Sequence, residues 1–127
     1  MTVGRAEFSQ DTSIQRIEPG TRMSMAVAHG PLVFTAGQVA KATAGASVGE
    51  QTREILALID GLLAQAGTDK TRLISANIWL TDIATFGEMN AEWDAWVAPG
   101  CAPARATVEA KLAAPQYKVE IAVIAAR

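Results

Sequence analysis

The chain has 127 residues and a mass of 13.4 kDa, which is enough for one domain with its own core. Half of its residues are apolar and 19% are charged, a balance that excludes an intrinsically disordered chain. The formal net charge of −2 argues against nucleic acid as the main partner, and no apolar run approaches the ~20 residues that span a bilayer.

The first 13 residues are polar and weakly patterned, so we expect a loose leader over about 1–13 ahead of a single domain. No apolar stretch follows its charge, which argues against a signal peptide and for a cytoplasmic protein. Cys101 is the one cysteine and His29 the one histidine, so an internal disulfide framework is excluded and a histidine-based zinc site or catalytic triad is untenable. Any catalysis must then use carboxylates, arginine, hydroxyls and the backbone.

Alternation predicts strands over 22–28 and 32–36, with a short strand at 15–17 before them. The turn residues at 29–31 make the two longer strands a hairpin candidate. A run of small residues at 42–49 is the one plausible flexible loop.

Two helices are predicted, over 47–66 and 82–97. The first opens with a capping box formed by Ser47 and Glu50, and Gly67 stands where a C-terminal cap is expected. Each helix carries one apolar stripe at helical spacing, made in the first by Thr52, Ile55, Leu56, Ile59, Leu62, Leu63 and Ala66, and in the second by Phe86, Met89, Trp93 and Trp96.

Three further strands are predicted at 73–81, 104–112 and 118–126. In 73–81, Ile74, Ala76, Ile78 and Leu80 are expected to share one face. The last strand is apolar on both faces except at Glu120, and such a strand must be covered on both sides. Two helices cover one face of a sheet, and this short chain has nothing left for the other. We therefore expect an α+β homo-oligomer whose second sheet face curls closed or packs against another subunit.

Arg105 and Glu120 are the leading candidates for chemistry. Arg105 lies among small residues in the run 102–106. It is either a solvated strand arginine or a fork that binds a carboxylate through two parallel hydrogen bonds. Glu120 is either a strand-end carboxylate in a salt bridge or a general base whose pKa is raised by partial burial.

Other positions carry weaker signals. Asn90 lies at the edge of the aromatic stripe and is either a surface amide or a ligand group. Trp93 and Trp96 have core spacing, which favours packing on the sheet. Gly37 ends a strand where a backbone can approach a ligand closely, but no phosphate-loop motif is present. By themselves these residues name no reaction.

Several short segments, taken in order, resemble the Rid family, also called the YjgF-like family, of reactive-intermediate imine deaminases. The resemblance runs from about residue 22 to the C-terminus. Its segments are FTAGQV at 34–39, the helix with Gln51-Thr52, Phe86 with Met89-Asn90 and Trp93, PARATV at 103–108 and KVEI at 118–121.

This resemblance implies a fold like that of the small trimeric chorismate mutases. Three subunits then pack their sheets into a central barrel, with helices outside and a ligand cleft at each subunit boundary. The implied activity is hydrolysis of 2-imino acids such as 2-iminobutanoate and 2-iminopropanoate, or their enamine tautomers, to 2-keto acids and ammonia. No metal, organic cofactor, nucleic acid or membrane is implied.

The resemblance also implies roles for single residues. Arg105 matches the arginine that holds the substrate carboxylate, and Glu120 matches the glutamate that positions or deprotonates the attacking water. Gly37 matches the glycine whose backbone lines the cleft, and Asn90 matches an asparagine near it. Thr107 stands where many members have a cysteine and can still donate a hydrogen bond to the substrate.

Alternatives to a deaminase stay open. Many members carry a tyrosine before the first main strand, where this chain has the stretch 22–25, so a non-catalytic module that binds a small carboxylate also fits. A nuclease or translation-inhibitor role is ascribed to some relatives, but the acidic balance counts against it. A chorismate mutase is disfavoured, because its dianionic substrate calls for several cations and only Arg105 can be placed.

Overall fold

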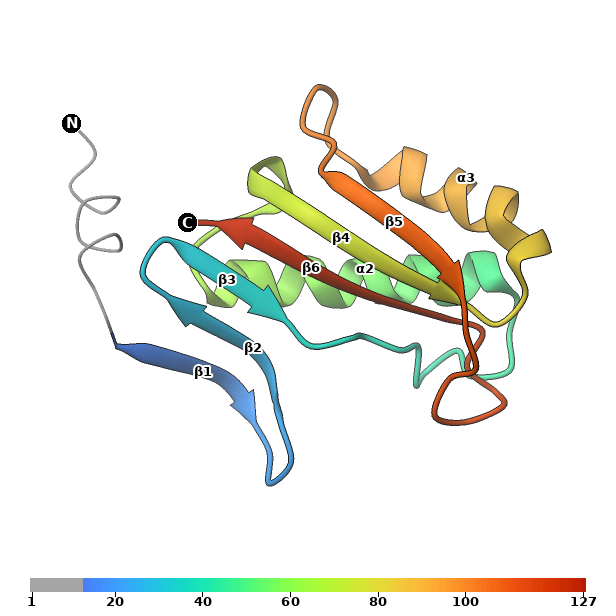
Figure 1. The fold of residues 1–127 in the computed structure, drawn as a ribbon, viewed down its shortest axis with the longest axis horizontal. Helices are drawn as coiled ribbons and strands as arrows, with labels where there is room; N and C mark the ends of the chain where they lie inside the picture. The colour runs from blue at the N-terminus through green and yellow to red at the C-terminus, as the bar shows by residue number, and fades with distance from the viewer. Residues whose placement is uncertain (1–12) are drawn as a thin grey trace.

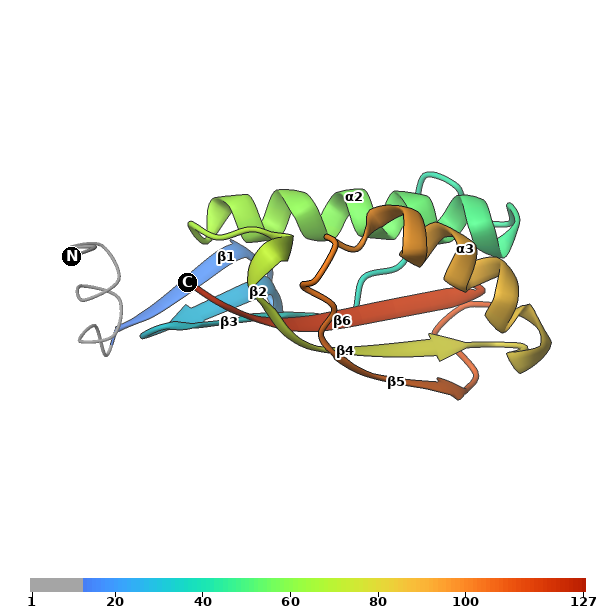
Figure 2. The same cartoon turned by 90° about the horizontal axis from the view of Figure 1, so that it is seen from above.

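A computed structural model describes residues 13–127 of the chain. Six strands form one mixed sheet in the order β1-β2-β3-β6-β4-β5, and helices α2 and α3 lie on one of its faces (Figure 1 and Figure 2). This confirms the predicted α+β fold with both helices on one side. The leader expected over about 1–13 lies outside the described residues, apart from Ser13.

The elements follow the predicted order, and most of them begin or end within a few residues of the expected positions. They are β1 (Ile14–Pro19), β2 (Ser24–His29), β3 (Leu32–Thr35), α2 (Val48–Gln65), β4 (Leu73–Leu80), α3 (Phe86–Trp96), β5 (Ala104–Glu109) and β6 (Val119–Ala126).

The strand order places the two leading candidate residues on different parts of the sheet. Strand β6 is inserted between β3 and β4, so Glu120 lies in the middle of the sheet. Strand β5 pairs with β4 in parallel and forms one edge, which carries Arg105. A parallel pair needs a crossover connection, and α3 provides it, so this helix lies beside β5 (Figure 1).

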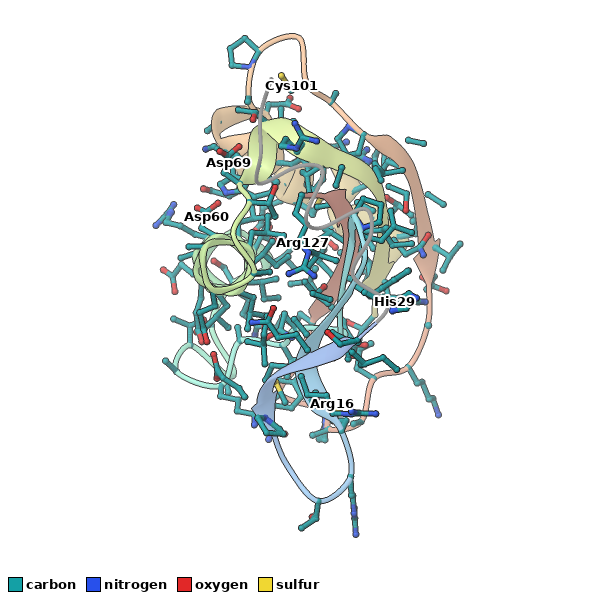
Figure 3. The ribbon with its side chains drawn as sticks, turned by 90° about the vertical axis from the view of Figure 1, so that its left-hand side faces the viewer. Arg16, His29, Asp60, Asp69, Cys101 and Arg127 are labelled. Carbon is teal, nitrogen blue, oxygen red and sulfur yellow. The ribbon has the colours of Figure 1, made fainter. Side chains whose placement is uncertain are left out.

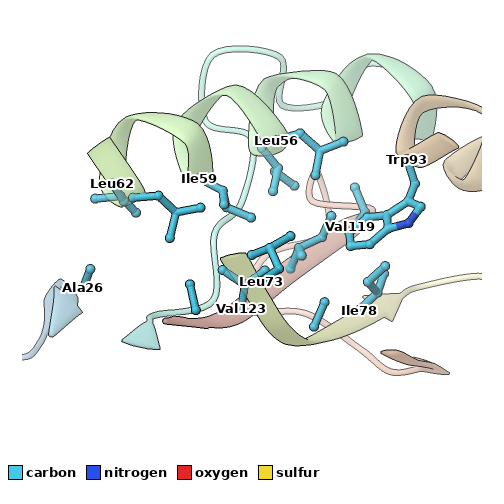
Figure 4. Packing of buried hydrophobic residues seen from close by; sticks show 14 of the residues in the cluster. Ala26, Leu56, Ile59, Leu62, Leu73, Ile78, Trp93, Val119 and Val123 are labelled. Carbon is cyan, nitrogen blue, oxygen red and sulfur yellow. The ribbon is translucent and has the colours of Figure 1, made fainter. Parts of the chain in front are cut away.

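The core lies between α2 and the sheet. The whole predicted stripe of α2 is buried, and Leu56, Ile59 and Leu62 point toward Val119 and Val123 of β6 (Figure 4). The Ser47 half of the predicted capping box is present, since the Ser47 hydroxyl accepts a hydrogen bond from the Glu50 backbone N–H at 3.2 Å. Burying these side chains is what holds the helix on the sheet.

The other face of the sheet has no covering layer in the described chain. Along β6 the residues at 119, 121, 123 and 125 are buried, and the alternate residues on the opposite face are only half-buried. On that open face Phe34 is 40% exposed and Val108 is 50% exposed. We therefore find the uncovered apolar face that the sequence predicts.

Two details differ from the sequence-based prediction. A bulge between Leu73 and Ser75 turns Ile74 outward, so Ile74 is 45% exposed and Leu73 takes the buried place. The second helix begins at Phe86 rather than at Asp82, because the Asp82 side chain caps a short 3-10 turn over Ile83–Thr85.

The C-terminal residue belongs to the interior. Arg127 is 7% exposed, and its Nε donates to the Gly30 carbonyl at 2.9 Å. Figure 3 shows Arg127 between α2 and the strands, whereas His29 lies on the side of the sheet away from α2. Within residues 13–127 no helix has both the length and the apolar character needed to cross a membrane.

Candidate active site

Arg105 points toward the helices from the edge strand β5. Its register partner in β4 is Ala76, which is 1% exposed beneath the helical layer, so both side chains lie on that face. The guanidinium carbon lies 5.2 Å from the centre of the Trp93 ring and 5.6 Å from that of Phe86. Arg105 is thus half-buried against α3 rather than fully solvated.

The sequence of α3 explains this arrangement. Phe86, Asn90 and Trp93 recur at i, i+4 and i+7, so they form one stripe along the helix. Trp93 is 4% exposed and belongs to the core, as predicted, whereas Phe86 is 40% exposed and lies at the rim. The apolar stripe predicted for this helix includes Phe86 and Trp93, but the pattern does not predict their contact with Arg105.

Two buried polar atoms on these same elements have no hydrogen-bond partner among residues 13–127. They are Asn90 Oδ1 on α3 and Thr107 Oγ1 on β5. Thr107 pairs with the buried Ile78, so it lies on the same strand face as Arg105, two residues further along. An unsatisfied buried polar group costs about 1–3 kcal/mol, and a polar ligand relieves that cost. Three of the predicted site residues thus lie together between β5 and α3.

Glu120 and Gly37 form a second group on the other face of the sheet. The neighbours of Glu120 in β6, Val119 and Ile121, are fully buried on the helix side, so Glu120 points to the open face. A Cβ added to Gly37 would lie 2.1 Å from the Glu120 carboxylate oxygen Oε2, so the backbone of Gly37 passes directly beside this group. Gly37 and Glu120, both candidate site residues from the sequence, are therefore in contact.

The environment of Glu120 favours its neutral form. Burial raises the pKa of the Glu120 carboxyl above its ordinary value. Within residues 13–127 Glu120 forms no salt bridge, so the strand-end ion pair considered from the sequence is absent there. A carboxylate whose charged form is disfavoured by burial is a stronger base than an exposed one.

A cavity of about 460 Å³ adjoins Gly37, between α2, β2 and the segment that follows β3. Its apolar walls include Met23, Met25 and Leu62, and Lys41 lies among the polar lining residues. The sequence pattern does not indicate this cavity, because its walls come from segments that are far apart in the chain.

The predicted site residues therefore fall into two groups. Arg105, Asn90 and Thr107 lie on the helix side of the edge strand, whereas Gly37 and Glu120 lie on the open face. A single chain does not bring the arginine and the glutamate into one cleft. Across residues 13–127, no three His, Cys, Asp or Glu side chains are grouped so that they could hold a metal ion.

Comparison with known proteins places the chain in a family. Residues 13–127 match the family described as Endoribonuclease L-PSP. A RutC family protein of Haemophilus influenzae is 47% identical over 113 residues, which cover 89% of this chain and 97% of the relative. A solved YjgF-family protein of Neisseria meningitidis is 42% identical with a TM-score of 0.89, over 93% of this chain and 98% of that one. The chain belongs to the YjgF, or Rid, family.

The membership of the Rid family agrees with the observed fold. A solved Rid-family protein of Yersinia pestis is 26% identical, with a TM-score of 0.82 over 91% of this chain and all of that chain. The likeness covers the sheet and both helices, so the fold expected from the resemblance is confirmed at the level of one subunit.

Proposed function

We propose that this Rid-family protein hydrolyses 2-imino acids, or their enamine tautomers, to 2-keto acids and ammonia. One observation carries the proposal: the half-buried guanidinium of Arg105 has no carboxylate partner among residues 13–127. A guanidinium in that state binds a substrate carboxylate through two parallel charge-assisted hydrogen bonds. The activity that the family resemblance implies needs such an anchor.

In the proposed reaction Glu120 acts on water. It accepts a proton as the water oxygen bonds to the carbon of the protonated imine, which gives a neutral tetrahedral carbinolamine. The carboxyl then passes this proton to the amino nitrogen. As the C–N bond breaks and the C=O bond of the 2-keto acid forms, the hydroxyl proton returns to Glu120, which passes it to the departing ammonia. The raised pKa of Glu120 suits both steps, because proton transfer is most effective when the pKa lies nearer to the working pH.

Arg105 and Glu120 of one chain lie on opposite faces of the sheet, so the proposed reaction needs these two residues from two different chains. We propose that the open face packs against other copies in a homotrimer, with Arg105 of one subunit facing Glu120 of its neighbour across the boundary. The exposed apolar side chains of the open face support this, since they lose contact with water on assembly. The substrate then binds between subunits, with its carboxylate at Arg105.

A coupled assay tests the proposal. An amino-acid oxidase generates imines from several amino acids, and semicarbazide traps whatever is not hydrolysed. We expect the wild-type protein to lower the trapped product and Arg105→Ala to match a reaction without protein. If wild type and Arg105→Ala both match that control for every imine, the deaminase proposal fails.

A second candidate is a non-catalytic module that binds a small carboxylate. It is favoured by one feature, the stretch 22–25, in which Met23 lines the cavity beside Gly37 and no tyrosine is present. This candidate predicts that a 2-keto acid protects the fold against heat in an Arg105-dependent way, without turnover. A nuclease, the activity in the family's description, is less favoured because the formal net charge is −2.

A further inference from the structure

We infer that Phe86 and Trp93 are positioning residues that hold the Arg105 guanidinium in place for the substrate carboxylate. This inference rests on the proposed function and adds two residues to its site. Both rings come from α3, one turn on each side of Asn90, and both ring centres lie within 6 Å of the guanidinium carbon. That separation is within the range of cation–π attraction.

Most carboxylates on these elements bind other parts of the chain and not Arg105. Helix α3 and strand β5 carry four carboxylates, and three of them accept hydrogen bonds from other parts of the chain. The pairs are Glu88 with the Gly49 N–H at 2.7 Å, Glu92 with the Arg53 guanidinium at 2.7 Å and Glu109 with the Ile83 N–H at 3.0 Å. None of the three pairs with Arg105.

A salt bridge and a ring contact differ in whether the N–H groups of the guanidinium stay free to bind a substrate. A protein carboxylate occupies the N–H groups of a guanidinium, and a substrate carboxylate then has to displace it. An aromatic ring attracts the cation with its π-system and leaves the planar fork of N–H donors available. The rings therefore fix the orientation of Arg105 and leave its hydrogen-bonding groups to the substrate.

Phe86 offers the cleaner test of the two. It is 40% exposed at the rim, whereas Trp93 is 4% exposed and its replacement would disturb the core. Phe86→Leu keeps an apolar side chain but removes the aromatic ring, whereas Phe86→Tyr keeps an aromatic ring at this position. Lys70→Met is a matched control, because Lys70 Nζ lies 5.3 Å from the centre of the Trp96 ring and outside this site.

Binding of 2-oxobutanoate, a product of the proposed reaction, is measured by titration calorimetry, and imine turnover gives KM and kcat. We expect Phe86→Leu to weaken binding and raise KM about three- to tenfold, with kcat nearly unchanged. Phe86→Tyr and Lys70→Met should stay within about twofold of wild type. All variants should unfold at similar temperatures, so that a change in binding does not reflect lost structure.

Other outcomes overturn the inference in distinguishable ways. If Phe86→Leu binds as wild type while Arg105→Ala loses binding, the ring role is wrong and the anchor role of Arg105 stands. If Arg105→Ala binds as wild type, or the wild-type chain itself does not bind 2-oxobutanoate, the proposed function and this inference fail together.

Discussion

At the scale of single residues, the burial of Glu120 ties the stability of the protein to pH. The folded-state pKa of Glu120 lies above its ordinary value of 4.5 because burial disfavours the charge. A carboxyl whose pKa is raised on folding contributes its full stabilisation of the folded state below the unfolded-state pKa. This contribution is lost as the pH rises through the folded-state pKa. The burial of Glu120 therefore makes the protein less stable at neutral pH than at acid pH.

Replacement by the neutral isostere removes this effect. We expect the melting temperature of Glu120→Gln, minus that of wild type, to increase as pH rises from 4 to 8, and activity to fall about 100-fold. Thermal unfolding across this range checks the first part and the imine assay the second. A melting difference that is constant or that shrinks with pH would show that burial does not disfavour the charged form of Glu120.

Gly37 tests the contact with Glu120 independently. The side chain of Gly37→Ala would overlap the Glu120 carboxylate, whose free end can rotate away. We expect the fold to remain and activity to drop about as far as in Glu120→Gln, because the base is displaced. Gly61→Ala is the control, since nothing lies within 4 Å of a Cβ there, and it should retain full activity. Unchanged activity in Gly37→Ala would contradict the placement of Glu120.

Residue-level reasoning from the sequence proposed the residues of the candidate site but could not predict their geometry. Arg105 and Glu120 stand out because each is charged among small or apolar neighbours, and both belong to segments that resemble Rid proteins. The aromatic contacts of Arg105 could not be predicted, because a ring at core spacing has the same pattern whether it packs on a sheet or on an arginine. The opposite faces of Arg105 and Glu120 follow only from the strand register.

At the scale of elements, the helices were more predictable than the strands. The stripe and caps of α2 are local signals: the stripe is buried, Ser47 caps the first turn and Gly67 has the positive φ of a C-terminal cap. The bulge before Ser75 was not predictable, because it depends on the pairing of β4 with a strand about 50 residues away in sequence. For the same reason, alternation alone wrongly placed Ile74 on one face with Ala76, Ile78 and Leu80, which are buried.

Gln51 of α2 holds the segment that leads into β6. Its side chain is fully buried, and Oε1 accepts from the Lys118 N–H at 2.9 Å while Nε2 donates to the carbonyls of Ala46 and Gln116. We expect Gln51→Ala to lose about 3 kcal/mol of unfolding free energy, because buried backbone groups are left without partners. Urea unfolding at fixed protein concentration measures this loss.

The control for this experiment lies on the same helix. Gln65 also hydrogen-bonds, to Glu18, but the contact is exposed, so Gln65→Ala should change stability by less than about 0.5 kcal/mol. Equal losses in Gln51→Ala and Gln65→Ala would show that the buried contacts of Gln51 do not fix the start of β6.

At the scale of the whole molecule, the open face determines the proposed assembly. Phe34 on that face and Leu58 on α2 are both 40% exposed, which makes them a matched pair. We expect Phe34→Asp to lower the solution mass toward the 13.4 kDa of one chain, because the new charge lies in an apolar interface. Leu58→Asp should keep the wild-type mass of about three chains. Light scattering measures the mass of each variant in solution, and a wild-type mass equal to that of one chain would contradict the proposed assembly.

The shared site between subunits is the central claim, and one mixing experiment tests it most directly. Arg105→Ala and Glu120→Gln are each expected to be inactive alone. When the two are unfolded, mixed in equal amounts and refolded, about one boundary in four combines an intact arginine with an intact glutamate. We predict recovery of about a quarter of the wild-type rate of imine hydrolysis. No recovery, with mixed trimers demonstrated by native mass spectrometry, would contradict the claim.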